Sequence, residues 1–520
     1  MKLLFLTLAL IAGADFLESA VRLSGASCAE DLSQSEIERY ESLAAHPLDL
    51  NGATRRELLA SGLFSAYQVA TILDYIAGNG EICSIAELGT VDGIGPERAR
   101  DLAPFVLLEP AGRLGARPRK RLRADSMVRL ADKSGTWSNA AKASASYGGF
   151  KAGLGAKDLS PTAGYLSWSG RRIVGQLTVG DFSARFGQGL LTWTGFTMTT
   201  LYTVGAFARS GTGISGSNTL SAGSAKRGMA ADFQLGPVDL WAYATLDGEQ
   251  MVHVQHISRR ATVGATVLHD LAGFACSADW RFTLGKFTAF GESAINIVIP
   301  DSDRVSLSTR AGLFYNHSYG NRAALLLRYS SDERAAALGG ENRWASLTAE
   351  ASQNLSKQTR QLRTVALCNP SFSFGAWTLK PSFRLNSRYR PDEELEWRSD
   401  LRAELEIQGG PWLLHGRYNA LRCENWAWLS YLEAGYKNEK TALYLRGTLF
   451  KVDNWNDRIY SYERDAPGSF NVPAYYGRGY ALALYVRRRS LALRAATTRY
   501  PWTPDKKPKF ELKLQLNIRI

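Results

Sequence analysis

The chain has 520 residues and a net charge of +13, which predicts two or more structural units or one very large sheet. It is rich in glycine (48 residues) and in aromatic residues (11%), yet no segment after residue 20 approaches the roughly 20 uninterrupted apolar residues of a spanning helix. The composition excludes a helical membrane protein, so any membrane crossing must be made by strands.

Residues 1–29 are predicted to be a signal peptide. Lys2 gives a positive start, the run from Leu3 to Ile11 is apolar but too short to span a membrane, and small residues follow. Cleavage is expected after Ser27-Cys28-Ala29, and Ala12-Gly13-Ala14 offers an earlier alternative. Lipidation of Cys28 is a less favoured interpretation, because Gly25 stands where a Leu-like residue is wanted. The chain is therefore predicted to be exported.

Residues 30–47 form an N-terminal segment, and residues 48–110 show helical periodicity. The stretch "SIAELGTV" begins with a capping box of Ser84 and Glu87. In the following "VDGIGPERARDLAPFV", two glycines permit positive φ and a proline suits the first position of the next helix. We expect a small all-α domain.

This domain resembles the tandem helix-hairpin-helix pair of the ComEA competence family. "LNGATRRELL" matches the family's opening and the "GIG" stretch with its following arginine matches the second hairpin, whereas the first hairpin keeps Gly62 but has Ser65 at the second glycine. The resemblance implies that hairpin backbone N–H groups bind a DNA phosphate without reading the base sequence. The implied contact residues are Gly93, Ile94, Gly95, Arg98 and Arg100.

Residues 111–124 form a basic linker beside an acidic domain. Residues 48–110 carry nine acidic side chains against four arginines, and this net charge of −5 disfavours phosphate binding by the domain alone. The linker could supply a nucleic-acid arm, and the alternatives are a tether for the barrel or a contact with anionic lipid headgroups. The linker residues predicted to bind DNA are Arg117, Arg119, Lys120, Arg121 and Arg123.

Residues 125–520 alternate with period two. From Trp397 to Ile407 the odd positions are almost wholly apolar and the even positions are all charged. The last strand, from Phe510 to Ile520, has the same pattern and resembles the assembly signal of bacterial outer-membrane barrels. Its apolar face would cause aggregation at the edge of a soluble sheet, whereas a closed barrel in lipid has no edge. At roughly 20 to 24 residues per strand and loop, we expect about 18 strands.

Residues 182–228 depart from the alternation. They are rich in Gly, Ser and Thr and too long for a simple turn. We expect either a plug inside the barrel or a long surface loop.

The order of these parts is similar to a family of outer-membrane proteins from the Bacteroidota, in which a leader and ComEA-like hairpins precede a long barrel. The stretch "GDFSARFGQGLLTWTGF" (180–196) is similar to a segment of that family. The predicted fold is therefore an α+β multidomain chain, with a small all-α tandem helix-hairpin-helix domain followed by a large antiparallel transmembrane β-barrel. The expected location is the bacterial outer membrane, with the hairpin domain in the periplasm.

The residue types of common catalytic and metal sites are scattered. The six histidines and five cysteines lack ligand spacing, and no nucleotide-binding or hydrolase motif occurs. We therefore predict no metal, no cofactor and no enzymatic activity. A hydrolase built on a Ser/His pair of the barrel wall is a less favoured alternative. Isolated thiols are favoured for the cysteines, and a disulfide between Cys368 and Cys423 is an alternative that their spacing leaves open.

The predicted function is non-specific DNA binding linked to DNA uptake or passage across the outer membrane, with DNA and outer-membrane lipid as partners. The alternative is a structural or interaction protein, or a general pore, whose hairpin domain docks a periplasmic protein. A secreted soluble β-protein is disfavoured by the closing strand.

Overall fold

A helical domain precedes the barrel in the computed structural model, which describes residues 16–108, 122–170, 173–195, 201–221, 223–258, 260–298, 305–318, 320–391, 393–503 and 506–519. The helical domain comprises α2 (Phe16–Ser24), η1 (Ala29–Asp31), α3 (Gln34–Ala45), β1 (Leu48–Asp49), α4 (Arg55–Ser61), α5 (Ala66–Asn79), α6 (Ile85–Leu88), α7 (Pro96–Leu102), η2 (Ala103–Phe105) and β2 (Val106–Leu107). No helix among the described residues is both long enough and apolar enough to cross a membrane.

Side-chain caps define where the helices of this domain begin. Ser33, Thr54 and Ser65 start α3, α4 and α5 with capping boxes, each closed by a Glu or Gln three residues on. Ser65, which stands where the first hairpin would have its second glycine, is therefore the N-cap of α5. The parallel pair β1 and β2 joins the start of the predicted hairpin domain to its end.

The helices share one apolar core that includes residues on both sides of position 30. Ala20 of α2 and Tyr40 of α3 are buried in it with Ile72, Ile94 and Phe105. Residues 16–47 are thus packed with residues 48–108 as one folded body.

The barrel is closed and antiparallel with 24 strands, so the expected count of about 18 is wrong. The strands are β3 (Arg123–Lys133), β4 (Thr136–Tyr147), β5 (Phe150–Lys157), β6 (Ser160–Ser169), β7 (Val174–Arg185), β9 (Lys226–Leu235), β10 (Val238–Thr245), β11 (Gln250–Ile257), β12 (Ala261–Asp270), β13 (Gly273–Leu284), β14 (Phe287–Val298), β15 (Val305–Ser318), β16 (Asn321–Tyr329), β17 (Glu333–Glu341), β18 (Ala345–Asn354), β19 (Thr359–Cys368), β21 (Trp377–Tyr389), β22 (Glu396–Gly409), β23 (Trp412–Arg422), β24 (Trp426–Lys437), β25 (Thr441–Val452), β28 (Gly477–Arg488), β29 (Leu491–Arg499) and β30 (Lys509–Arg519). Short β8 (Gly213–Gly216) and β20 (Phe372–Phe374) add to β7 and β21.

The count was too low because the connections are shorter than the estimate assumed. Many consecutive strands are joined by two-residue turns, as between β4 and β5 or between β28 and β29. The strands themselves span 8 to 14 residues. More strands therefore fit into the same length of chain.

The two faces of the wall follow the predicted alternation. In β22, Trp397 and Leu401 are exposed on the outside, and in β30, Phe510 and Ile518 are exposed while Gln515 is buried on the inside. Strand β30 pairs with β3, which closes the sheet. The outer surface is apolar and the inner surface is polar, so the molecule is an outer-membrane-type β-barrel.

Both ends of the barrel's chain, Arg123 and Arg519, lie at one end of the barrel, here called the terminal end. The opposite end is called the loop end. Two long connections leave strands at the loop end: segment 186–225 between β7 and β9, and segment 453–476 between β25 and β28. The second contains β26 (Ile459–Tyr460) and β27 (Ala474–Tyr475).

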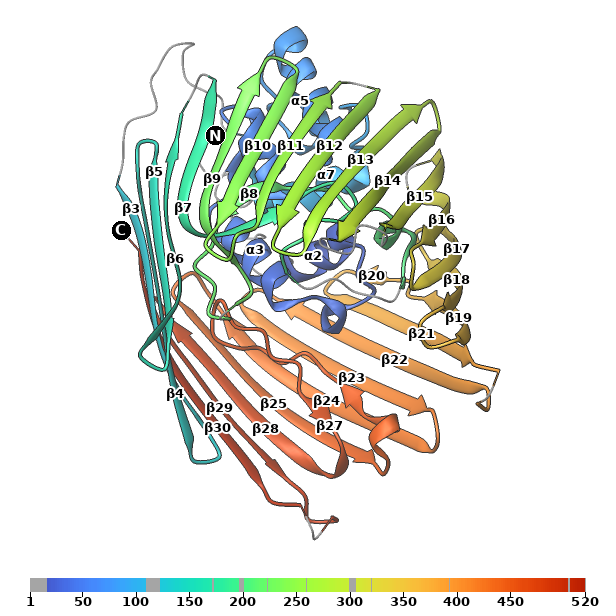
Figure 1. Cartoon of the computed structure of the whole chain (residues 1–520). Coiled ribbons are helices and arrows are strands. Elements are labelled where there is room, and N and C mark those ends of the chain that lie inside the picture. The colour runs from blue at the N-terminus through green and yellow to red at the C-terminus, as the bar shows by residue number, and fades with distance from the viewer. Residues whose placement is uncertain are drawn as a thin grey trace.

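The strands surround the helical domain (Figure 1). The domain was expected in the periplasm, whereas in the structure it lies in the lumen. Arg55 of α4 donates to the carbonyl oxygen of Gly236 at 3.2 Å, in a turn of the terminal end. Helix α5 lies against β11 and β12. We call residues 16–108 the plug.

Candidate functional site

The predicted hairpin forms a tight turn between α6 and α7. Gly93 and Gly95 have φ of +79° and +77°, which side chains rarely tolerate, and Ile94 between them is fully buried. Pro96 follows as the first residue of α7. The local geometry is therefore that of a glycine hairpin entering a helix.

The hairpin is packed against α5. A side chain at Gly93 would place its Cβ 2.5 Å from Cε1 of Tyr67. The Tyr67 hydroxyl donates to Oδ2 of Asp92 at 2.6 Å, and Nε2 of Gln68 donates to the Gly93 carbonyl at 2.7 Å. These contacts give Gly93 a structural reason that involves no ligand.

The predicted DNA-binding residues are only partly described. Nη2 of Arg98 donates to the Leu63 carbonyl at 2.8 Å, so this side chain holds the domain together. Arg100 is exposed on α7, and Arg123 is exposed at the start of β3. The other linker positions lie outside the described residues: Arg117, Arg119, Lys120 and Arg121.

Acidic residues of the plug face basic residues of the barrel wall. The acids belong to α2, η1 and α3, and the bases belong to β4, β21, β22 and β23. The ion pairs are Glu18–Lys380 (2.9 Å), Asp31–Arg384 (2.8 Å), Glu30–Arg402 (3.3 Å), Glu30–Arg417 (2.6 Å) and Glu38–Lys142 (2.7 Å). We call this set the acidic seat.

Glu30 is the most enclosed acid of the seat. Its Oε1 accepts from Arg417 and also from the backbone N–H of Tyr462 at 3.1 Å. Burial acts to raise the pKa of Glu30, but the guanidinium groups of Arg402 and Arg417 hold that pKa well below its usual range. The carboxylate is therefore ionised in the lumen.

The opposite side of the plug has the reverse polarity. Arg55 and Arg56 of α4 lie 3.4 Å from Asp239 of β10 and Asp232 of β9, respectively. The plug is thus held between a basic part and an acidic part of the same wall, which fixes its orientation in the lumen.

The described residues of segment 186–225 (186–195, 201–221 and 223–225) fold inward from the loop end. The carboxylate of Glu292 accepts from the backbone N–H groups of Gln188 at 2.7 Å and Leu190 at 3.1 Å. On the neighbouring strand β15, at the same level as Glu292, Nη2 of Arg310 donates to the carbonyl of Phe207, at the end of η3 (Val204–Phe207), at 2.8 Å. Phe207 is fully buried against the inner wall.

Segment 453–476 also folds inward and touches the plug. Glu463 pairs with Arg494 of β29, and Arg464 pairs with Glu433 of β24 at 2.8 Å. At its tip, the N–H of Gly468 donates to Oε2 of Glu41 at 2.6 Å. The plug is therefore in contact with the strands and with an inward loop.

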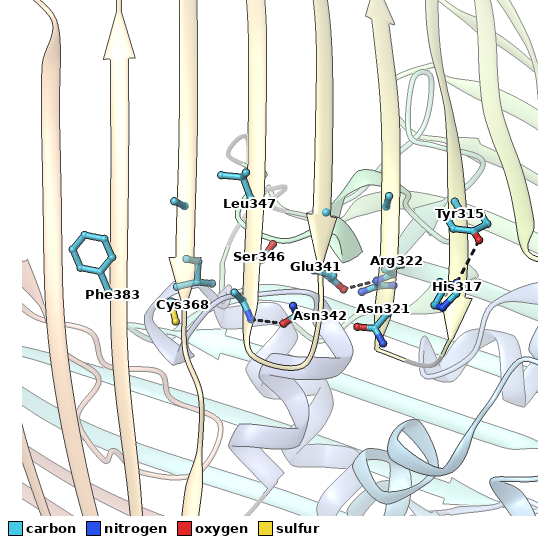
Figure 2. Close-up of a pocket in the computed structure, with 15 residues that line it drawn as sticks. Tyr315, His317, Asn321, Arg322, Glu341, Asn342, Ser346, Leu347, Cys368 and Phe383 are labelled. Atoms are coloured by element: carbon cyan, nitrogen blue, oxygen red, sulfur yellow. Dashed lines mark hydrogen bonds and ion pairs between the residues drawn. The ribbon is translucent and has the colours of Figure 1, made fainter.

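A surface hollow of about 610 Å³ lies at the terminal end of β15–β19 and β21. Figure 2 shows Arg322 and Glu341 facing each other there, with Tyr315 beside His317. Glu341 also accepts from the N–H of Val204 at 2.8 Å, so the pair supports η3 of the inward segment. Outward apolar residues such as Leu347 and Phe383 form much of the remaining lining of the hollow. The lining side chains therefore do not form a catalytic site.

Metal-ligating residues do not gather in the described part of the chain. No three His, Cys, Asp or Glu side chains are placed to hold a metal ion there. The five cysteines are free thiols, which corrects the open alternative of a Cys368–Cys423 disulfide.

No family model matches the chain, and no curated protein matches it in sequence. Among solved structures, it is similar to the E. coli P pilus tip assembly intermediate PapC-PapD-PapK-PapG, with 9% identity and a TM-score of 0.48 over 79% of this chain and 64% of that chain. It is also similar to the siderophore receptor PirA from Pseudomonas aeruginosa (10% identity, TM-score 0.37, 77% and 81% covered). A third is OccK5 (OpdH) from Pseudomonas aeruginosa (9% identity, TM-score 0.30, 77% and 98% covered).

Likenesses of this degree concern barrel architecture and supply no substrate or partner for this chain. The resemblance to ComEA and the Bacteroidota origin are not confirmed by any of these comparisons. What the chain does must therefore be argued from the lumen itself.

Sequence reasoning did not find the acidic seat. Glu18 was assigned to the leader, and Glu30 and Asp31 to a segment without a role. The alternation in residues 397–407 marks Arg402 only as one of the charged positions of its strand. The sequence signal that could have indicated this pairing was the opposite charge of the N-terminal part and the rest of the chain.

Proposed function

We propose that the chain is a plugged outer-membrane channel, closed at rest by its own helical domain. The short turns of the terminal end match the periplasmic side of bacterial barrels, so the plug would face the periplasm through that end. Opening requires that the plug, or part of it, be displaced from the wall.

The observation that carries this proposal is the polarity of the interface between plug and wall. The plug has its own apolar core, and among the described residues that core buries only one barrel side chain, Ile257. The contacts to the strands are mainly ion pairs and hydrogen bonds. Such an interface exposes no large apolar surface when it separates, which suits a reversible closure rather than a permanent one.

Conductance of the full chain in planar lipid bilayers tests the proposal. We compare the wild type with Glu18→Gln/Glu30→Gln/Asp31→Asn/Glu38→Gln, which neutralises the acidic seat, and with Asp74→Asn, an exposed acid of α5. At low salt the wild type and Asp74→Asn should be mostly closed and the seat variant mostly open. Raising the salt should open the wild type only in part, because salt screens the more exposed pairs of Glu18 and Glu38, whereas the buried pairs of Glu30 are screened much less. Equal, high conductance of all three at low salt would overturn the proposal.

Non-specific DNA handling remains a second candidate, favoured by the glycine hairpin geometry and by the exposed Arg100. DNA uptake has no further support. Titration of the full chain in detergent micelles with short duplex DNA over a salt series tests it. Binding that weakens steeply with salt and falls in Arg100→Gln would favour it. Absence of binding at low salt would leave the docking of a periplasmic protein as the alternative for this surface.

A further inference from the structure

We propose that Arg384, Arg402 and Arg417 form a binding site for acidic peptides on the lumen wall, and that Glu30 and Asp31 of the plug occupy this site in the closed state. The proposal rests on the proposed function, because it names the class of ligand that would compete with the plug. We call the three residues the arginine triad.

The triad is a built site rather than a set of surface charges. The side chains of Arg417, Arg402 and Arg384 are 2%, 13% and 15% exposed, and they come from the adjacent strands β23, β22 and β21. The neighbouring backbone N–H of Tyr462 adds a fixed donor to the same carboxylate that Arg417 binds. Two adjacent carboxylates of one short peptide segment are thereby held together.

Arg384 takes its close anionic partner from the plug, whereas Asp400, which stands opposite it on β22, accepts from Nδ2 of Asn419. In the described part of the chain, this guanidinium donates to Ser27, Cys28 and Asp31 of the plug, and its ion pair is with Asp31. The ring of Tyr202, from the inward segment, lies 4.5 Å from its Cζ. When the plug leaves, this cation loses its anionic partner, and a ligand carboxylate can take that place.

The other two arginines have weaker partners on the wall. Glu404 lies 3.7 Å from Arg402 and 3.8 Å from Arg417, which is longer than the 2.6 Å contact of Arg417 with Glu30. Nη2 of Arg417 donates to Asn419 at 2.8 Å, which orients the guanidinium and leaves Nη1 directed to Glu30. The plug's carboxylate therefore has the better geometry of the two anions.

The chemistry of the occupant defines the ligand. It is a Glu-Asp pair on the short η1 turn, with two carboxylates that reach different arginines. Guanidinium groups prefer carboxylates and phosphates, and the spacing here is that of neighbouring peptide side chains. An acidic peptide fits both features.

Calorimetric titration of the full chain in detergent micelles tests the site. The probe is the peptide acetyl-Ala-Glu-Asp-amide, and its matched control is acetyl-Ala-Gln-Asn-amide. The variant Glu30→Gln/Asp31→Asn, which vacates the triad, should bind the acidic probe at least about tenfold more tightly than the wild type does and should not bind the neutral one. Adding Arg384→Gln/Arg417→Gln should abolish that binding.

Glu38→Gln is the matched control variant, because it removes an ion pair between plug and wall away from the triad. It should show no gain in peptide binding. Glu30→Gln alone, which keeps the Asp31–Arg384 pair, serves if the double variant does not fold. Equal binding of the two peptides, equal binding of inorganic phosphate, or no binding by any vacated variant would overturn the proposal. Loss of the peptide site with retained salt-dependent conductance would leave the plugged channel standing.

Discussion

Glu41 is the residue at which the plug's position should depend on pH. Burial raises the pKa of Glu41 to about 7 from its ordinary value of 4.5, opposed by the hydrogen bond from the Gly468 N–H. Glu38 adds repulsion, whereas Arg129 and Arg519 favour the charged form. Between pH 4.5 and about 7, the docked plug therefore holds a proton on Glu41 that the released plug does not hold.

The sign of the effect follows from that difference in proton binding. Docking is stabilised as pH falls from about 7 towards 4.5, and this stabilisation is lost as pH rises through about 7. We expect the channel to open more often at pH 8 than at pH 5.5, and Glu41→Gln to remove most of the difference by remaining closed at pH 8. Bilayer conductance between pH 5.5 and pH 8 measures this difference in opening. An unchanged pH profile in Glu41→Gln would show that another group is responsible.

Glu30 should contribute most to the retention of the plug. Removal of one partner of a buried ion pair leaves the other charge uncompensated, which typically costs about 3–5 kcal/mol. Glu30→Ala should therefore lower the urea concentration at which the plug is released. Release is measured as protease cleavage of the helical domain in the intact protein. Asp74→Asn should leave that concentration unchanged, and an equal shift in both variants would contradict the role of Glu30.

At the scale of elements, the glycine hairpin is required for folding of the plug. Gly93→Ala introduces a Cβ at positive φ against the ring of Tyr67, so we expect a loss of about 1–3 kcal/mol in the stability of the helical domain. Gly78→Ala in α5 is the control, because its Cβ would meet no atom within 4 Å and should be neutral or stabilising. Thermal unfolding followed by the helical circular dichroism signal compares the two. A neutral Gly93→Ala would show that the hairpin is not tied to α5.

Helix α2 bears on the site of leader cleavage. Ala20 is fully buried in the plug core, and Nε of Arg22 lies 2.7 Å from Asp101 of α7. Cleavage after Ala29 would remove both contacts, so we expect the earlier site after Ala14. N-terminal sequencing of the protein from membranes should find a chain that begins before Phe16. A mature chain that begins at Glu30 would contradict this expectation.

The alternation of side chains predicted the barrel wall well. Trp397 and Leu401 lie outside and Arg402 lies inside, as period two requires, because each residue type is selected by lipid or by the lumen. The number of strands was not predictable in the same way, because the turns are short and carry weak signals. The helices of the plug were anticipated from caps such as Ser84, since capping is a local interaction.

At the scale of the whole molecule, the place of the helical domain could not be predicted from local patterns. Its position depends on ion pairs between residues far apart in the chain, such as Glu18 with Lys380. Periodicity and capping report on neighbours along the chain and contain no information about such pairs. The net charge of −5 for residues 48–110 was read as poor DNA binding, and the structure shows acids of the preceding residues 18–38 seated on a basic wall.

The central claim is that the helical domain occupies the lumen in the membrane, and site-specific photo-crosslinking in intact cells tests it most directly. A photoreactive amino acid replaces Gln34 of α3, whose side chain donates to the Gly468 carbonyl at 3.1 Å, and in a control it replaces the exposed Asp74. We expect that Gln34 crosslinks within the chain to peptides of segment 453–476 and that Asp74 does not. Crosslinks from Gln34 only to other proteins, with none to the barrel, would contradict it.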